Sequence, residues 1–486
     1  MIYKEISNFS SDGKELEYLF HPQGIAVVGV SQNPANLGRQ FFLPLIQLQY
    51  KGNLYPVGLE DSEIAGLKIY KSILDIPEPI DYVICCIPAS ATPQLVEDCV
   101  KKKVKVVQFF TSGFSETGEE EGKELEQKLL DIARRGGVRL IGPNCLGIYC
   151  PGQGLTFLNT VPSLARSGEI GFLSQSGGNS RELIEIGSVR GIYYSKGISF
   201  GNACDLNESD FLEYFAQDKE TKIIGVYIEG VKDGRRFFRA LRAAARIKPT
   251  IILKGGQTEA GSQAALSHTG SLAGNEIVWQ AICQQTGAML VNDLDEMMDL
   301  MLAFSYVKRP RGRRLGVVGF GGGRSVQSAD DCERARLSVP SFPPEIRQKL
   351  REFTPEAGTS VRNPVDSSPF VFWDPLLFFQ TLEIVESYDG VDSLLVYLPM
   401  AFAFVDRGEQ LIRVQVEAIK DFKAKSRKPL IVALLSGDIP HVLQLGFELQ
   451  RILVDAGIPV YPSPGRAACA LSRFVKYYER NLSQPF

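Results

Sequence analysis

The sequence predicts an α/β protein in which three doubly wound domains follow one another along the chain. Its 486 residues correspond to roughly three domains of about 150 residues each. Short apolar runs alternate with amphipathic stretches, which is the pattern of buried parallel strands joined by crossover helices. Apolar residues make up 44% and charged residues 22% of the chain, as is typical of globular proteins.

The composition excludes several other classes of protein. The formal net charge of −3 argues against nucleic acid or an anionic membrane as the main partner. No apolar run approaches the roughly 18 residues of a membrane-spanning helix, and residues 1–9 lack the apolar core of a signal peptide. The nine cysteines include no C-x-x-C pair, so we expect reduced thiols, no redox cofactor and a cytoplasmic protein.

Residues 1–150 form the first predicted domain. Its strands are expected at residues 24–30, 53–57, 82–87, 104–110 and 138–141, with helices at 92–102 and 119–135. This alternation predicts a Rossmann-like domain. The turn at residues 29–38 is not the G-x-G-x-x-G fingerprint of dinucleotide-binding domains. A nucleotide-bearing ligand other than a nicotinamide cofactor fits the polar strand ends, and plain tight turns are the alternative.

Residues 151–307 and 308–486 form the second and third predicted domains. The second has expected strands at residues 169–173, 197–199, 223–228, 250–253 and 288–291 and ends in a helix at 294–304. A basic linker at residues 308–314 leads to the third. Its strands are expected at residues 315–320, 393–398, 430–435 and 459–461, with helices at 407–425 and 439–456.

Two turns of the third domain have weaker interpretations. The glycine-rich turn at residues 319–325 lacks the Lys-Ser/Thr ending of a P-loop, so it does not indicate an ATPase. Close backbone packing and a phosphate contact are both open for it. Residues 363–366, Asn-Pro-Val-Asp, are expected to form a turn.

The segment at residues 267–274, Ser-His-Thr-Gly-Ser-Leu-Ala-Gly, is the most informative stretch of the chain. It places His268, one of three histidines, among small residues that expose backbone N–H groups and hydroxyls, which suits a phosphoryl group. No further His, Cys or carboxylate stands at the spacing of a zinc site, so no metal is expected. His268 is therefore a candidate nucleophile for phosphate. His21 and His441 have neighbourhoods typical of structural residues.

The second domain supplies two further candidates at the same sheet edge. The strand at residues 223–228 ends in Glu229, and a carboxylate bonded to one imidazole nitrogen leaves the other free to attack. The alternative is that Glu229 caps a solvent loop. The turn at residues 174–177, Ser-Gln-Ser-Gly, precedes a helix whose N–H groups suit a phosphate.

Six motifs in this order resemble the α subunit of NDP-forming acyl-CoA synthetases, within the succinyl-CoA synthetase superfamily. They are residues 141–147, 174–177, 228–230, 253–256, 267–274 and 363–366. The resemblance covers residues 19–474 and implies a CoA-binding first domain followed by two flavodoxin-like domains of the succinyl-CoA ligase type. It implies an acid–thiol ligase that interconverts a carboxylic acid, CoA and ATP with acyl-CoA, ADP and phosphate.

The resemblance also implies site residues. His268 would be phosphorylated, passing the phosphoryl group to an acyl phosphate, and Glu229 would orient it. The phosphate contacts would be Ser174, Ser176, Gly177, Ser267, Thr269 and Gly270. The CoA contacts would be Gly29, Ser31, Gln32, Pro56, Val57, Ile87, Pro88, Ala89, Thr111, Ser112, Gly113 and Asn144. Residues 57–60, Val-Gly-Leu-Glu, depart from the Asn-Pro-Lys-like pattern of the family and lack a basic contact for CoA there.

The chain shows no convincing ATP-grasp segment. The resemblance therefore implies that ATP or ADP and Mg²⁺ bind a separate ATP-grasp β subunit in an α2β2-type assembly. A catalytically silent CoA-binding sensor or scaffold of the same fold is the alternative function. A relative that transfers acyl or carbamoyl groups without phosphohistidine is a third, against which the intact His268 motif argues.

Overall fold

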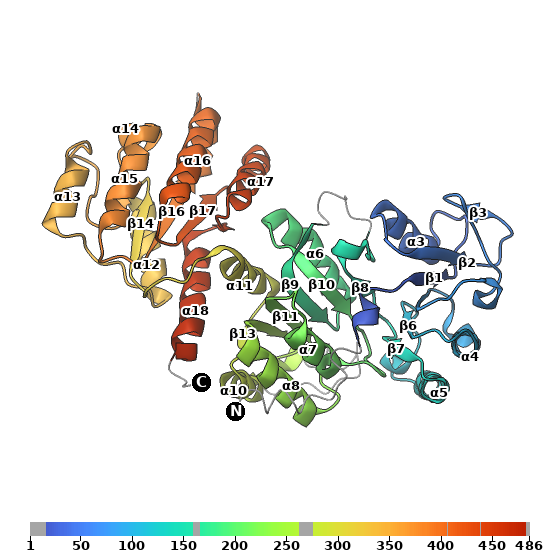
Figure 1. Cartoon of the computed structure of the whole chain (residues 1–486). Helices are drawn as coiled ribbons and strands as arrows, with labels where there is room; N and C mark the ends of the chain where they lie inside the picture. Colours follow the sequence, from blue (N-terminus) through green and yellow to red (C-terminus); the bar gives the residue numbers. More distant parts are fainter. Residues whose placement is uncertain (1–15, 159–165, 262–275, 406, 438, 483–486) are drawn as a thin grey trace. The chain divides into compact units, whose positions relative to one another are not determined.

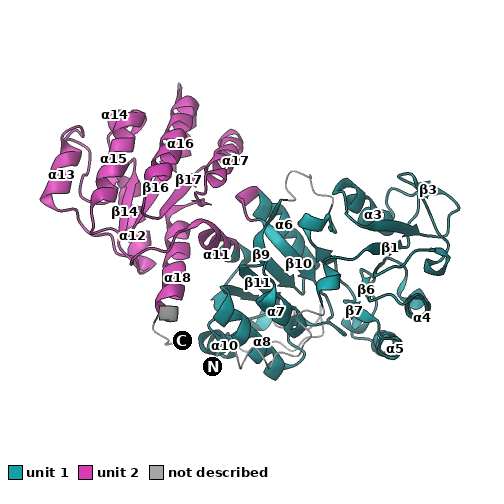
Figure 2. Ribbon diagram, in the orientation of Figure 1, with its two compact units in different colours: residues 1–188, 193–297 teal, residues 189–192, 298–486 magenta. Residues whose placement is uncertain are grey.

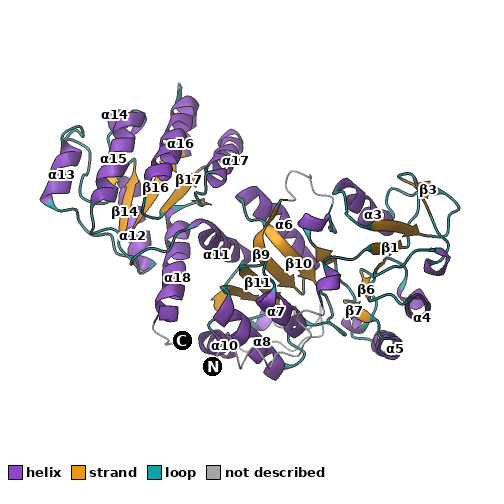
Figure 3. Cartoon of the chain, viewed as in Figure 1, coloured by secondary structure: helices purple, strands orange, loops and turns teal. Residues whose placement is uncertain are grey.

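The computed structural model describes residues 16–158, 166–261, 276–405, 407–437 and 439–482. Figure 1 traces the helices and strands along the chain, and Figure 2 separates two compact units. Unit 1 comprises residues 1–188 and 193–297, and unit 2 comprises residues 189–192 and 298–486. Helices lie against sheets in both units (Figure 3).

The first sheet of unit 1 is wholly parallel, with the order β2-β1-β5-β6-β7. Its strands are β1 (Gly24–Val28), β2 (Asn53–Val57), β5 (Tyr82–Cys85), β6 (Val106–Phe109) and β7 (Arg139–Ile141). Its helices are α3 (Leu37–Gln47), α4 (Thr92–Lys102) and α5 (Glu120–Gly136). A small hairpin, β3 (Glu63–Ile64) and β4 (Leu67–Lys68), follows β2. The strands are continuous apolar runs, as expected for a parallel sheet, and residues of β5 and β6 share one buried core with residues of α4 and α5.

The second sheet has the order β13-β12-β11-β9-β10-β8. Its strands are β8 (Gly147–Tyr149), β9 (Ser167–Ser174), β10 (Tyr194–Ser199), β11 (Ile223–Ile228), β12 (Thr250–Lys254) and β13 (Met289–Val291). Its helices are α6 (Gly177–Arg190), α7 (Glu208–Gln217), α8 (Gly234–Ile247) and α10 (Glu276–Thr286). Strand β8 was not predicted from the sequence. It pairs antiparallel with β10, so this sheet is mostly rather than wholly parallel.

The sheet of unit 2 is parallel, with the order β15-β14-β16-β17-β18. Its strands are β14 (Leu315–Gly319), β15 (Val365–Asp366), β16 (Ser393–Pro399), β17 (Leu430–Leu435) and β18 (Val460–Tyr461). Its helices are α12 (Gly322–Arg334), α13 (Pro344–Arg351), α14 (Pro369–Trp373), α15 (Pro375–Ser387), α16 (Gly408–Lys425), α17 (Pro440–Asp455) and α18 (Pro464–Leu482). Helix α11 (Leu294–Tyr306) precedes them.

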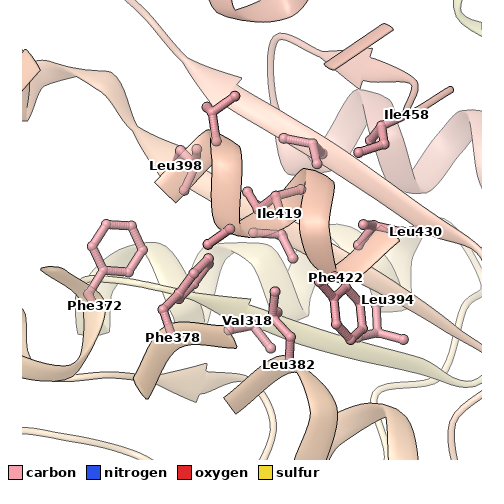
Figure 4. Packing of buried hydrophobic residues seen from close by; sticks show 14 of the residues in the cluster. Val318, Phe372, Phe378, Leu382, Leu394, Leu398, Ile419, Phe422, Leu430 and Ile458 are labelled. Atoms are coloured by element: carbon pink, nitrogen blue, oxygen red, sulfur yellow. The ribbon is translucent and has the colours of Figure 1, made fainter. Parts of the chain in front are cut away.

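The core of unit 2 lies between its sheet and the helices α15 and α16. Figure 4 shows Val318 and Leu394 of the sheet near Leu382 of α15 and Phe422 of α16, all buried. Such a continuous apolar interior fixes the ends of the strands and therefore the turns that follow them.

The expectation that residues 363–366 form only a turn is wrong in part, because Val365 and Asp366 form strand β15 beside β14. The side chain of Asn363 explains how a polar turn enters the sheet. Its amide accepts from the backbone N–H of Val317 at 3.0 Å and donates to the carbonyl of Leu315 at 2.9 Å. The side chain thus takes the place of a strand partner along β14 just before β15 begins.

In each sheet the first parallel strand lies between the second and the third, so the strand order reverses beside it. In such doubly wound sheets, ligands bind outside the carboxyl ends of the strands at the point of reversal. The predicted fold class, α/β with mostly parallel sheets, is confirmed, and the three sheet edges are the places to look for sites.

Candidate functional site

The carboxyl edge of the second sheet brings three predicted segments together. Strand β11 lies between β9 and β12, and the register pairs Tyr227 with Ser174 and Ile228 with Lys254. Parallel strands that end in register place the residues after them at one edge. Glu229 therefore lies beside the turn that begins at Ser174.

Glu229 is a buried carboxylate with one unsatisfied oxygen. Its side chain belongs to a residue that is 7% exposed, which contradicts the alternative that it caps a solvent loop. The Tyr227 hydroxyl donates to Oε1 at 3.1 Å. The amide oxygen of Gln175 accepts from the backbone N–H groups of Glu229 and Gly230 and so holds the turn. Oε2 is buried and has no hydrogen-bond partner among the described residues.

A buried carboxylate oxygen without a hydrogen-bond donor is energetically costly. A buried carboxylate oxygen without a donor costs about 1–3 kcal/mol or more, since charged groups cost more than neutral ones. Such an atom in a folded protein points to a donor that arrives from elsewhere. The geometry offers one acceptor atom, Oε2, to an N–H group.

The turn before helix α6 lies at the same edge. The Ser176 hydroxyl accepts from the backbone N–H of Asn179 at 3.2 Å and so caps the helix. The Ser174 hydroxyl donates to the carbonyl of Ser176 at 2.8 Å. The first turn of α6, which begins at Gly177, offers backbone N–H groups and the positive end of the helix dipole to an anion.

Two residues that sequence reasoning left without a role also lie at this edge. Lys254, the last residue of β12, is 2% exposed, and its Nζ lies 5.6 Å from the centre of the Trp279 ring. Burial lowers the pKa of Lys254, against the attraction of Glu229. Tyr227 binds Glu229 directly. A lysine directly after the apolar residues 251–253 was the available signal for Lys254, and period-two spacing from Glu229 was the signal for Tyr227.

The central predicted residues, Ser267, His268, Thr269 and Gly270, lie outside the described residues. Their segment connects β12 with α10 along the chain. The role of His268 therefore stays a prediction, as do the phosphate contacts. The other two histidines pair with glutamates: His21 Nε2 lies 2.9 Å from Glu17 and His441 Nε2 lies 3.6 Å from Glu409.

The twelve predicted CoA contacts occupy the strand ends and following turns of the first sheet. After β1, Gly29 has φ +102°, and its N–H and that of Val30 donate to the Val57 carbonyl at 2.9 Å. The N–H of Ser31 donates to the Asn36 side chain, which also caps α3. The N–H of Gln32 donates to the Glu60 carboxylate at 2.9 Å.

The turns after β5, β6 and β7 are connected to one another. The Thr111 hydroxyl donates to the Ile87 carbonyl at 2.7 Å, and the N–H of Asn144 donates to the Thr111 carbonyl at 3.0 Å. The N–H of Gly113 donates to the Glu116 carboxylate at 2.6 Å. Carboxylates of the chain itself thus bind two of the predicted anion donors, those of Gln32 and Gly113, and the Thr111 hydroxyl is used internally.

In the third sheet, close packing explains the first glycine of the glycine-rich turn, Gly319. A Cβ at Gly319 would lie 2.2 Å from the Tyr397 ring, so glycine is needed there for close packing. The N–H of Gly321 donates to Asp366 at 2.8 Å, and burial raises the pKa of Asp366. A cavity of about 360 Å³ that Arg324 lines lies beside this turn.

The described parts of the chain contain no group of three or more His, Cys, Asp or Glu side chains arranged to hold a metal ion. No helix within those ranges is long and apolar enough to cross a membrane.

Comparisons with known proteins agree with this layout. A family model described as "CoA binding domain" matches residues 23–151, and one described as "Succinyl-CoA ligase like flavodoxin domain" matches residues 167–304. The α subunit of acetate–CoA ligase [ADP-forming] II from Pyrococcus furiosus is 35% identical over 462 residues, which are 95% of this chain and 97% of the relative. The chain belongs to the ADP-forming acyl-CoA ligase family.

Two further relatives place the chain within this ligase family. The 4-hydroxybutyrate–CoA ligase [ADP-forming] of Nitrosopumilus maritimus is 31% identical; the match covers 96% of this chain and 65% of that protein. The dinucleotide forming acetyl-coenzyme A synthetase 1 of Ca. Korarchaeum cryptofilum, solved with phosphate and ADP, has a TM-score of 0.82 and 32% identity. That match covers 96% of this chain and 97% of the solved chain. This ligase chain is therefore of the α-subunit type with a CoA-binding domain, and the enzyme interpretation is favoured over the silent scaffold.

Proposed function

We propose that this α chain carries the phosphoryl group on His268 while Glu229 orients the imidazole. The observation that supports the proposal is the buried Glu229 Oε2, which has no donor among the described residues. An N–H of the His268 imidazole would satisfy it and leave the other ring nitrogen free as nucleophile. The carboxylate would also stabilise the positive ring that phosphorylation produces.

The reaction we propose has three steps. The γ-phosphoryl group of ATP passes to an imidazole nitrogen of His268, and ADP leaves. The phosphoryl group then passes to a carboxylate oxygen of the acid, which breaks the P–N bond and forms an acyl phosphate. The CoA thiolate attacks the acyl carbon, and inorganic phosphate leaves with the electrons of the C–O bond. Each covalent intermediate replaces one difficult step by easier ones.

We assign the remaining roles to the turns at the sheet edges and to a partner subunit. The Ser176-capped start of α6 would bind the phosphoryl oxygens, together with Ser174 and the hydroxyls of Ser267 and Thr269. The turns of the first sheet would bind CoA. We propose that ATP and Mg²⁺ bind an ATP-grasp β subunit in an α2β2-type assembly and that the acid is a small carboxylic acid.

Phosphoenzyme formation tests the proposal. The chain is incubated with acyl-CoA and inorganic phosphate, and acid-labile phosphate is measured on wild type, His268→Ala, Glu229→Gln and the matched control His441→Ala. We expect no phosphoenzyme with His268→Ala, a rate about 100-fold lower with Glu229→Gln, and the wild-type rate with His441→Ala. Phosphoenzyme on His268→Ala would overturn the proposal, and no phosphoenzyme on wild type, with acyl-CoA and phosphate or with ATP and the β subunit, would favour the CoA-binding scaffold.

A further inference from the structure

We propose that Tyr227 is a positioning residue that fixes the Glu229 carboxylate by a hydrogen bond. The inference rests on the proposed role of Glu229. It names a side chain of β11 that nothing in the predicted phosphate or CoA sets includes.

Tyr227 selects which carboxylate oxygen is offered. It stands two residues before Glu229 on β11, so both side chains lie on the same face. Its hydroxyl donates to Oε1 at 3.1 Å, which leaves Oε2 as the free acceptor. The side chain of Asn179, in the first turn of α6, hydrogen-bonds to Tyr227. Burial and the neighbouring Glu229 raise the pKa of Tyr227, so the phenol keeps its proton and remains a donor.

Gly255 shows that the side chains of Tyr227 and Glu229 are closely packed. A Cβ at Gly255 would lie 2.5 Å from the Tyr227 hydroxyl and 3.3 Å from Cγ of Glu229. The chain thus passes beside the Tyr227–Glu229 hydrogen bond with room for hydrogen alone. The Glu229 side chain is therefore restricted by the Tyr227 hydroxyl, which donates to it, and by the backbone of Gly255, which passes close to it.

This arrangement has a consequence for an imidazole partner. The Tyr227 hydrogen bond limits rotation of the carboxylate, so the unpartnered Oε2 keeps one direction.

The test compares Tyr227→Phe with wild type by the rate of phosphoenzyme formation from acyl-CoA and phosphate, at saturating and at limiting acyl-CoA. The structural control is Tyr194→Phe, whose buried hydroxyl donates to the Leu183 carbonyl. Thermal unfolding of every variant is measured beside the rate, because a purely structural role would affect both.

We expect Tyr227→Phe to lower the maximal rate about tenfold at an unchanged half-saturating concentration of acyl-CoA, with a thermal transition no lower than that of Tyr194→Phe. A wild-type rate in Tyr227→Phe would overturn the inference. Phosphoenzyme on His268→Ala would instead overturn the proposed function.

Discussion

Gly38 is the position where one added methyl group most directly tests the proposed CoA site. It is the second residue of α3, and a Cβ there would lie 2.4 Å from the Gly29 carbonyl oxygen and 2.9 Å from the backbone nitrogen of Val30. These are backbone atoms of the turn that is proposed to bind CoA. They cannot move aside as the end of a flexible side chain can.

The size of the effect follows from these distances. Ordinary C···O contacts are about 3.3 Å or longer, so Gly38→Ala must separate α3 and the turn by about 1 Å. Overpacking of this kind costs about 1–3 kcal/mol. A displacement of about 1 Å at a binding site weakens its function by about 100-fold. We expect CoA affinity to fall by about 10- to 100-fold.

Isothermal titration of CoA into the full chain measures this loss, and urea unfolding measures the stability. Gly234→Ala is the matched control, because Gly234 begins helix α8 and a Cβ there meets nothing within 4 Å. It should bind CoA like wild type. Wild-type affinity in Gly38→Ala would refute the assignment of this turn to CoA.

Two further predictions concern unit 2. The Asp299 carboxylate accepts hydrogen bonds from Arg466 at 2.6 and 2.9 Å and from Arg190, and its side chain is 6% exposed. Asp299→Ala would leave these two cations without their buried partner. We therefore expect it to lower the free energy of unfolding, measured in urea titrations, by about 3–5 kcal/mol. Burial raises the pKa of Asp366, so the ionised carboxylate lowers the stability of the folded protein at pH values above the ordinary aspartate range. Asp366→Asn removes this charge, and its amide oxygen can still accept the hydrogen bond from Gly321. We expect the variant to have a higher free energy of unfolding than wild type at pH 7, and we expect the difference to disappear below about pH 4.

The controls for both are available in the same unit. Asp330 forms an exposed pair with Arg334, and its replacement by alanine should cost less than about 1 kcal/mol. An Asp299→Ala variant as stable as that control would contradict the first prediction. An equal difference between Asp366→Asn and wild type at pH 7 and pH 4 would contradict the second.

The positions of the long, apolar strands could be predicted from the sequence alone. Residues 223–228 and 430–435 were predicted with the bounds that β11 and β17 have, because a buried parallel strand has no polar face to blur its pattern. Strand β8 has three residues and joins its sheet antiparallel to a strand about 50 positions away. Neither its length nor its partner is encoded in local periodicity. Strand β15 has two residues, and the polar Asn363 side chain that introduces it indicates a turn.

The candidate site divides in the same way. Glu229 was predicted because it ends a clear strand, and its burial excludes the solvent-cap alternative. Tyr227 was not given a role, because an aromatic residue at a strand end is compatible with simple packing. Only the 3.1 Å contact to Oε1 connects it with Glu229.

The most direct test of the account is to map the phosphoryl group on the chain. Wild-type protein is incubated with a panel of acyl-CoAs and inorganic phosphate, and its peptides are analysed by mass spectrometry under conditions that preserve acid-labile phosphate. The account predicts one phosphoryl group, on His268, with the acyl-CoAs that match the natural acid. Phosphate on another residue, or none with any acyl-CoA and none with ATP and the β subunit, would contradict it.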